Sequence, residues 1–177
     1  MTKSIPSHVR ISTLLIVICF GFMLASCGTM SGQTQAKPKS LMDFDAQAKE
    51  ILAQMTLDEK IGQMIQSEYV GMRDKNDIQK YFLGSVLMGG DSDPAAGNGL
   101  EAWTDVYDEV QSIAMKTRLG IPVMYGVDAV HGHSNVIGAV IFPHNIGLGC
   151  TNDPEIVREA GRITAIEMQA TGMNWTF

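Results

Sequence analysis

Charged side chains are almost absent from one long stretch of this 177-residue chain. Between Leu119 and Asn152 the only Lys, Arg, Asp or Glu is Asp128, within GVDAVHGHSNVIGAVIFPHNIGLG at 126–149. A carboxylate in such surroundings must be hydrated, hydrogen-bonded or paired with a distant group. Asp128 is therefore a candidate for ligand contact. The alternative is a structural aspartate that caps its own loop.

Clusters of basic residues are missing as well, and the formal net charge is −6. An acidic chain without Lys/Arg clusters lacks the electrostatic footprint of a nucleic-acid-binding protein, so we expect no nucleic-acid partner. The sequence is 45% hydrophobic and only 18% charged, which excludes a disordered chain and predicts a packed core.

Cysteine is scarce, and Cys150 is the only one beyond the first 27 residues. No intrachain disulfide is expected to hold the fold, and a lone cysteine among apolar residues is typical of a small buried side chain. His131, His133 and His144 invite a metal interpretation, but the sequence offers them no supporting ligand. We expect these imidazoles to bind loop backbone, and we expect neither a metal nor a cofactor.

A long apolar run is also lacking. Leu14–Ala25, LLIVICFGFMLA, is shorter than the roughly 20 residues that span a bilayer. Its length and its position behind Lys3 and Arg10 are typical of a secretory signal.

The run ends in LASC, Leu24–Cys27, which resembles the lipobox of bacterial lipoproteins. The resemblance implies cleavage before Cys27 and lipidation of Cys27, with an ordinary signal peptide as the alternative. We therefore predict a lipoprotein signal peptide at 1–26 and a flexible tether at 27–40. The predicted location is the cell envelope, lipid-anchored, in the outer membrane or periplasm.

Residues 41–177 alternate helical and strand patterns. Apolar residues recur at helical spacing in 44–55, 57–65, 100–117 and 153–170, and short apolar runs at 84–88, 122–127 and 173–177 predict strands. Thr56–Glu59 resembles a capping box, and Asp153-Pro154 predicts the start of the last helix. The residues expected to point inward are Trp103, Val106, Val110, Ile113 and Ala114 in 100–117, and Ile156, Val157, Ala160, Ile163 and Ile166 or Glu167 in 153–170. Strands that alternate with helices predict a parallel α/β fold. Because a full (β/α)8 barrel needs about 250 residues, we predict an incomplete (β/α)8 TIM-like barrel with the first two to three strands only.

Asp128 comes where the second predicted strand ends. Ligands of barrels and open α/β sheets bind at the carboxyl ends of strands, and an ionised carboxylate is a good acceptor for sugar hydroxyls. Five other side chains receive structural interpretations. We expect Asp91 and Asp93 to form a turn, Trp103 and Trp175 to lie in the core, and Glu167 to be a solvated or paired helix residue.

Several motifs in order resemble glycoside hydrolase family 3, in particular its β-glucosidases and exo-β-glucanases. MTLDEKIGQM at 55–64 is similar to the family's N-terminal helix, and TRLGIPVMYGVDAVHG at 117–132 is similar to its second strand and substrate loop. The resemblance covers about 41–177. It implies an N-terminal part of the family's barrel domain, truncated at Phe177.

The resemblance also implies roles. The aspartate of the GVDAVHG segment, Asp128 here, would bind hydroxyls of the terminal sugar in subsite −1. Family members retain anomeric configuration by using an aspartate nucleophile and a glutamate acid/base. Both would lie beyond Phe177, so no catalytic residue is expected in this chain.

Two functions follow as expectations. In the first, the parent protein is a retaining exo-acting β-glucosidase or β-glucan glucohydrolase that releases terminal glucose from β-linked oligosaccharides or glucosides, and this chain alone is inactive. In the second, the protein is a noncatalytic, lipid-anchored, glycan-binding lipoprotein.

Overall fold

The computed structural model describes residues 40–177. The chain divides into two units, Met1–Leu41 and Met42–Phe177, and the sheet lies in the second. The predicted signal peptide at 1–26, the lipidation site Cys27 and the predicted tether up to residue 39 lie outside the described residues. Among the described residues, no helix has the length and apolar character needed to cross a membrane.

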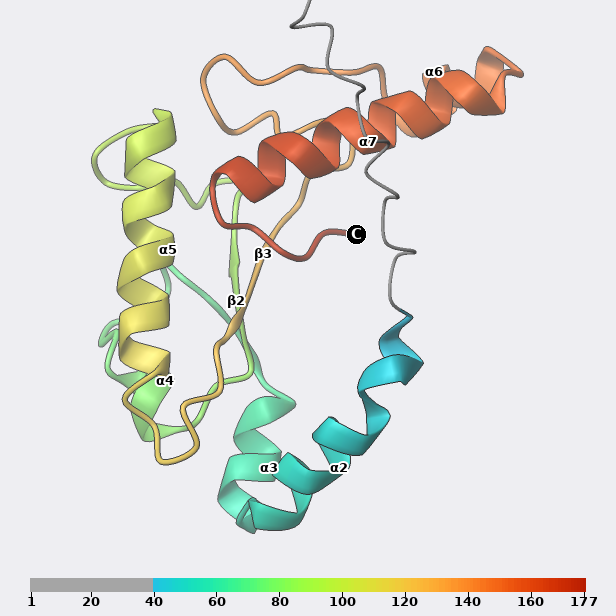
Figure 1. Ribbon diagram of the computed structural model, residues 1–177. Coiled ribbons are helices and arrows are strands. Elements are labelled where there is room, and N and C mark those ends of the chain that lie inside the picture. Colours follow the sequence, from blue (N-terminus) through green and yellow to red (C-terminus); the bar gives the residue numbers. More distant parts are fainter. Residues whose placement is uncertain (1–39) are drawn as a thin grey trace, which may run out of the picture. The chain divides into compact units, whose positions relative to one another are not determined.

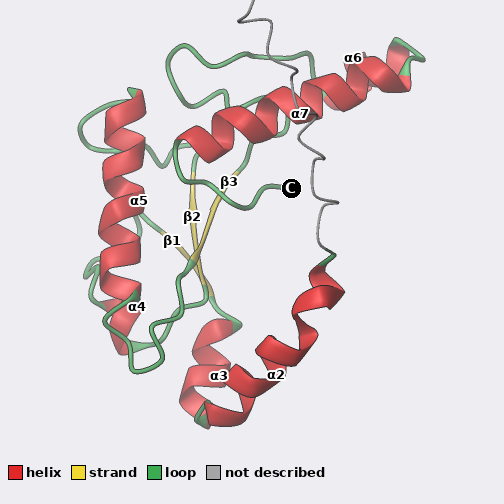
Figure 2. Ribbon diagram, in the orientation of Figure 1, coloured by secondary structure: helices red, strands yellow, loops and turns green. Residues whose placement is uncertain are grey.

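Helices and short strands alternate through the described part of the chain (Figure 1). The elements, coloured by type in Figure 2, are η1 (Leu41–Phe44), α2 (Asp45–Gln54), α3 (Leu57–Gln63), β1 (Gln66–Glu68), α4 (Asp77–Lys80), β2 (Ser85–Met88), α5 (Leu100–Ala114), β3 (Met124–Val127), α6 (Asn145–Cys150) and α7 (Pro154–Ala170).

The three strands form one parallel sheet in the order β1-β2-β3. Beyond β3, Trp175 forms a single parallel bridge with Gly126, so the predicted third strand at 173–177 is only an isolated bridge. The strand β1 was not predicted, because its residues Gln66, Ser67 and Glu68 are polar and show no apolar strand pattern. The predicted parallel α/β arrangement is confirmed.

One face of the sheet packs against α5, which lies beside β2 and β3 in Figure 1. On β2 and β3, Val86, Met88, Tyr125 and Val127 are at most 1% exposed. On α5, each residue predicted to point inward is buried, namely Trp103, Val106, Val110, Ile113 and Ala114. Burial of a large apolar side chain contributes about 1.5–3 kcal/mol, so this layer supplies much of the stability of the fold.

The helix α7 begins as predicted, since the Asp153 side chain caps it by accepting from the Glu155 N–H at 2.9 Å, and Pro154 is its first residue. Its buried face was predicted only in part. The expected stripe contained Ala160, which is buried, but also Ile156, Val157 and Ile166, which are exposed. The buried Thr164 and Met168 were not expected. Both sets recur at helical spacing, so periodicity alone did not distinguish them.

No helix was predicted between 122–127 and 153. Residues Asn145–Cys150 nevertheless form the short helix α6, and its glycines, Gly147 and Gly149, have no positive φ. Cys150, at the end of α6, is exposed rather than buried.

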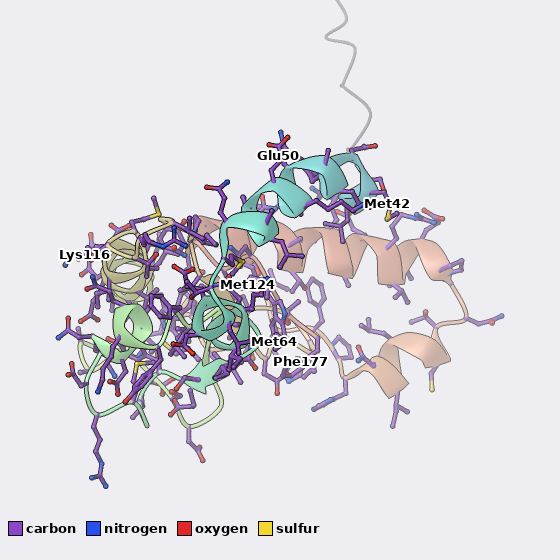
Figure 3. All side chains as sticks on the ribbon, turned by 90° about the horizontal axis from the view of Figure 1, so that it is seen from below. Met42, Glu50, Met64, Lys116, Met124 and Phe177 are labelled. Carbon is purple, nitrogen blue, oxygen red and sulfur yellow. The ribbon has the colours of Figure 1, made fainter. Side chains whose placement is uncertain are left out.

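The helix α2 buries none of its residues, and Figure 3 shows Glu50 projecting from it.

The start of α3 is held by a capping box and an ion pair. Thr56 Oγ1 accepts from the Glu59 N–H at 3.2 Å, and the Glu59 carboxylate accepts from the Thr56 N–H at 2.8 Å. The same carboxylate accepts from Arg118 Nε at 3.0 Å and from its terminal nitrogen at 2.7 Å. The Arg118 hydrogen bonds, followed by that of the Thr56 N–H, lower the pKa of Glu59 from 4.5 to about 2.

We expect Glu59→Gln to lower the melting temperature of the chain at neutral pH. Because the folded-state pKa lies below the unfolded value, the ionised carboxylate stabilises the fold above pH 4.5, and this contribution is lost as the pH falls from 4.5 toward 2. Thermal unfolding followed by circular dichroism across pH 2–7 measures this effect. The melting temperatures of the wild type and of Glu59→Gln should differ at pH 7 and converge toward pH 2.

The control is Glu155→Gln. It removes an exposed pair with Arg158, in which both side chains are 73% exposed, and such pairs contribute little. If Glu59→Gln and Glu155→Gln lowered the melting temperature equally at pH 7, the stabilising role of the ionised Glu59 carboxylate would be contradicted.

Candidate functional site

Three parallel strands place their carboxyl ends at one edge of the sheet. This edge carries Glu68 at the end of β1, the turn 89–92 after β2, and Asp128 directly after β3. In Figure 1 the chain enters the segment before α6 and α7 from this end of β3. Acidic side chains of different strands therefore share the edge at which ligands of α/β folds bind.

Asp128 is exposed, and its carboxylate has no hydrogen bond or ion pair with any residue of 40–177. The backbone around it is fixed, because the Ala129 N–H donates to Val127 O and to Thr176 Oγ1, each at 3.1 Å. The loop-capping alternative requires this side chain to bind its own loop, and it does not. An anchored backbone with a free carboxylate suits a group that receives hydrogen bonds from a ligand.

Glu68 was not singled out by the sequence, because β1 was missed. Its carboxylate accepts from the Val70 N–H at 2.9 Å, from the Gly71 N–H and from the Ser92 hydroxyl. Loss of hydration by itself raises the pKa of Glu68, but these hydrogen bonds and the charge of Lys75 outweigh it, and the net effect is a lowered pKa. The side chain thus links β1 to the turn after β2 and is not available as a partner for Asp128.

Asp91 lies in the turn 89–92 after β2, as expected, whereas Asp93 follows this turn and is not part of it. The Gly89 N–H donates to Ser92 O at 3.0 Å, and the Ser92 N–H donates back to Gly89 O at 3.2 Å. Both aspartates are exposed beside this turn.

The two tryptophans differ. Trp103 is fully buried in the core, as expected. Trp175 is half-buried and lies over Gly126, where a Cβ atom would stand 2.5 Å from its ring. Its ring meets Phe177 edge to face at a centroid distance of 4.9 Å. Glycine in β3 therefore makes room for the indole beside the strand that leads to Asp128.

Residues 128–144, which follow β3, contain no helix or strand, but several contacts hold them. The Phe142 N–H donates to His131 O at 2.7 Å, and the Ile137 N–H donates to Asn98 O at 2.8 Å. The Val140 N–H donates to both carboxylate oxygens of Glu167 at 3.1 and 3.2 Å. Glu167 was expected to be solvated or paired, and it is a half-buried acceptor that ties this loop to α7.

The three loop histidines do not converge on one point. The rings of His131 and His144 pack at a centroid distance of 4.5 Å, whereas His133 is buried beside Thr171, with Nε2 at 2.9 Å from Oγ1. Within residues 40–177 no group of three or more His, Cys, Asp or Glu side chains is placed to hold a metal ion. The expected bonds from imidazole rings to loop backbone are not what holds His133, since its partner is a hydroxyl.

A cavity of about 430 Å³ lies between α7 and the segments 129–132 and 173–176. Its walls are mostly apolar and include Ala160, Thr164 and Met168, the buried stripe of α7. Asp128 does not line it. The cavity belongs to the packing of α7, and the candidate site is the open edge at Asp128.

Comparison with known proteins gives consistent matches. The sequence profile of the Glycosyl hydrolase family 3 N terminal domain matches residues 56–177. The chain is 32% identical over 143 residues to the lysosomal beta glucosidase of Dictyostelium discoideum, covering 72% of this chain and 17% of that protein.

Two solved structures have a similar fold. The exo-1,3/1,4-beta-glucanase of a Pseudoalteromonas species is 40% identical with a TM-score of 0.70, covering 81% of this chain and 18% of that one. The beta-glucosidase of Listeria innocua in complex with glucose is 30% identical with a TM-score of 0.53, covering 75% and 18%. The chain spans less than a fifth of the length of each of these three relatives.

Proposed function

Because the chain belongs to glycosyl hydrolase family 3 across residues 56–177, we propose that its parent protein is a retaining, exo-acting β-glucosidase or β-glucan glucohydrolase. It releases terminal glucose from β-linked oligosaccharides or glucosides. The N-terminal domain of this family is a TIM-type barrel, and the parallel sheet with its helices is the first part of such a barrel, as predicted.

The exposed, unpartnered carboxylate of Asp128 carries the proposal. It lies at the carboxyl end of β3, inside the matched region, with its backbone anchored to Val127 and Thr176. A terminal sugar offers adjacent hydroxyls, and an ionised carboxylate accepts hydrogen bonds through both of its oxygens. Asp128 therefore binds sugar hydroxyls in subsite −1 and has no covalent role.

The chemical step needs two carboxylates, one as nucleophile and one as acid/base. We place both outside residues 40–177, as the family resemblance implies. Glu68 and Glu167 are engaged in structural hydrogen bonds: Glu68 accepts three, and Glu167 accepts from the Val140 N–H. This chain supplies one wall of the sugar site.

We expect the purified 177-residue chain to show no hydrolysis of an aryl β-glucoside, because it holds neither catalytic carboxylate. Release of the aryl chromophore measures the rate, and the parent protein is the positive control. A hydrolysis rate that persists through purification and is abolished by Asp128→Asn would show that the catalytic groups lie within this chain. That result would contradict the placement of both carboxylates outside it.

In the parent protein, we expect Asp128→Asn to lower kcat/KM for the aryl β-glucoside by roughly 30- to 150-fold, since charge-assisted hydrogen bonds contribute about 2–3 kcal/mol. The melting temperature should barely change, because the carboxylate has no partner among residues 40–177. The control is Asp108→Asn, on the exposed face of α5.

Unchanged kinetics in Asp128→Asn would remove the sugar-binding assignment. A parent protein that binds β-glucans without hydrolysing any glycoside would instead favour the noncatalytic glycan-binding lipoprotein.

We also propose that Cys27 carries lipid and anchors the protein in the cell envelope, in the outer membrane or periplasm. The support is the LASC segment behind an apolar run of signal-peptide length. In bacteria grown with labelled palmitate, Cys27→Ser should abolish labelling of the protein and move it from the membrane to the soluble fraction. Retained label or unchanged membrane association would contradict the anchor.

A further inference from the structure

The loop that begins with Asp128 is joined to the rest of the fold by one fully buried polar side chain, His133. Its side chain is 1% exposed, and it lies five residues beyond Asp128. Nε2 lies 2.9 Å from Thr171 Oγ1, where α7 ends, and the ring meets Trp103 of α5 edge to face at a centroid distance of 5.4 Å. His133 thus contacts the helix before β3 and the end of the helix after the loop.

The hydrogen bonds fix which ring nitrogen carries the proton. Thr171 Oγ1 lies 2.9 Å from Met168 O, and a carbonyl oxygen can only accept, so the single hydroxyl hydrogen points to Met168. The hydroxyl is then the acceptor toward His133, and Nε2 carries the hydrogen. In the neutral ring Nδ1 is a bare acceptor, and it is buried with no hydrogen-bond partner among residues 40–177.

This environment favours the neutral ring. Protonation would place a second N–H at Nδ1, which has no acceptor within the described part, and would bury a charge. Burial accordingly lowers the pKa of His133, and the negative charge of Glu167 on α7 opposes this effect. A neutral imidazole with one defined donor is a directional link between the loop and α7.

The loop backbone next to His133 is closely packed. Gly132 has a φ of 102°, and a Cβ atom there would lie 2.1 Å from Val140 O, so only glycine fits at this position. The Phe142 N–H donates to His131 O at 2.7 Å, and the Val136 N–H donates to His133 O at 3.1 Å. The His133 ring is thus attached to a short, closely packed segment that begins at Asp128.

We propose that His133 is a positioning residue for the sugar site, and that it orients Asp128 by fixing the loop to α5 and to the Thr171 hydroxyl. This inference rests on the function proposed above. His133 touches no substrate; its effect on binding passes through Asp128.

The test uses paired substitutions in the parent protein. Thr171→Val keeps the shape but removes the hydroxyl, whereas Thr171→Ser keeps the hydroxyl. His133→Asn is too short to reach Thr171, whereas His133→Gln places an amide donor near the Nε2 position. We expect Thr171→Val and His133→Asn to lower kcat/KM for an aryl β-glucoside by about tenfold, since small misplacements are costly. The Ser and Gln variants should stay within about threefold of the wild type.

A double-mutant cycle separates positioning from general damage to the fold. In the Asp128→Asn background, Thr171→Val should change kcat/KM by less than about twofold, because the group that it misplaces is already disabled. Amide hydrogen exchange gives a second readout: Thr171→Val should speed exchange at Ala129 and Val136, and Thr171→Ser should not.

The outcomes are distinct. Two results in an active parent would overturn the role of His133 and leave the proposed function standing. In the first, Thr171→Val and Asp128→Asn lower kcat/KM by factors that simply multiply in the double variant. In the second, Thr171→Ser lowers kcat/KM as much as Thr171→Val does. A parent that hydrolyses no β-glycoside would overturn the proposed function and the role of His133 with it.

Discussion

The strands β2 and β3 pair in parallel. In this pairing Ser85 lies opposite Met124, and Met88 lies opposite Val127. The helix α5 covers the apolar side chains that the pairing aligns. A strand shifted by one residue would turn Tyr125 and Val127 away from α5, so burial of these side chains sets the register. The register in turn determines where β3 ends, and Asp128 is the next residue. The position of the candidate site is thus a consequence of apolar packing between the sheet and α5.

The carboxyl edge of the sheet shows two different uses of an acidic side chain. Glu68 is surrounded by donors from the backbone and from Ser92, and its charge holds the turn after β2. Asp128 has no such donors within residues 40–177, while the chain on either side of it is fixed. Both carboxylate oxygens of Asp128 are therefore free of partners within residues 40–177, and hydroxyls of a ligand can replace the water around them.

The sequence was most informative where a single pattern decided the outcome. The inward face of α5, the capping box at Thr56 and the proline start of α7 were predicted because local spacing determines each of them. The strand β1 was missed because Gln66, Ser67 and Glu68 are polar, and only their pairing with β2 makes them a strand. In the candidate site, Asp128 was found because it is the only charged residue between Leu119 and Asn152. The contacts made by Glu68, Glu167 and His133 were not found, because each depends on a partner that lies 24 to 38 residues away in sequence.

The ion pair between Glu59 and Arg118 has a kinetic consequence. Its partners are 59 residues apart, and the intervening chain contains β1, β2 and α5. Closing a loop of that size costs conformational entropy that one exposed guanidinium cannot offset by itself. We therefore expect the pair to form once the sheet has brought its two ends together. Until then the first turn of α3 has only its local cap.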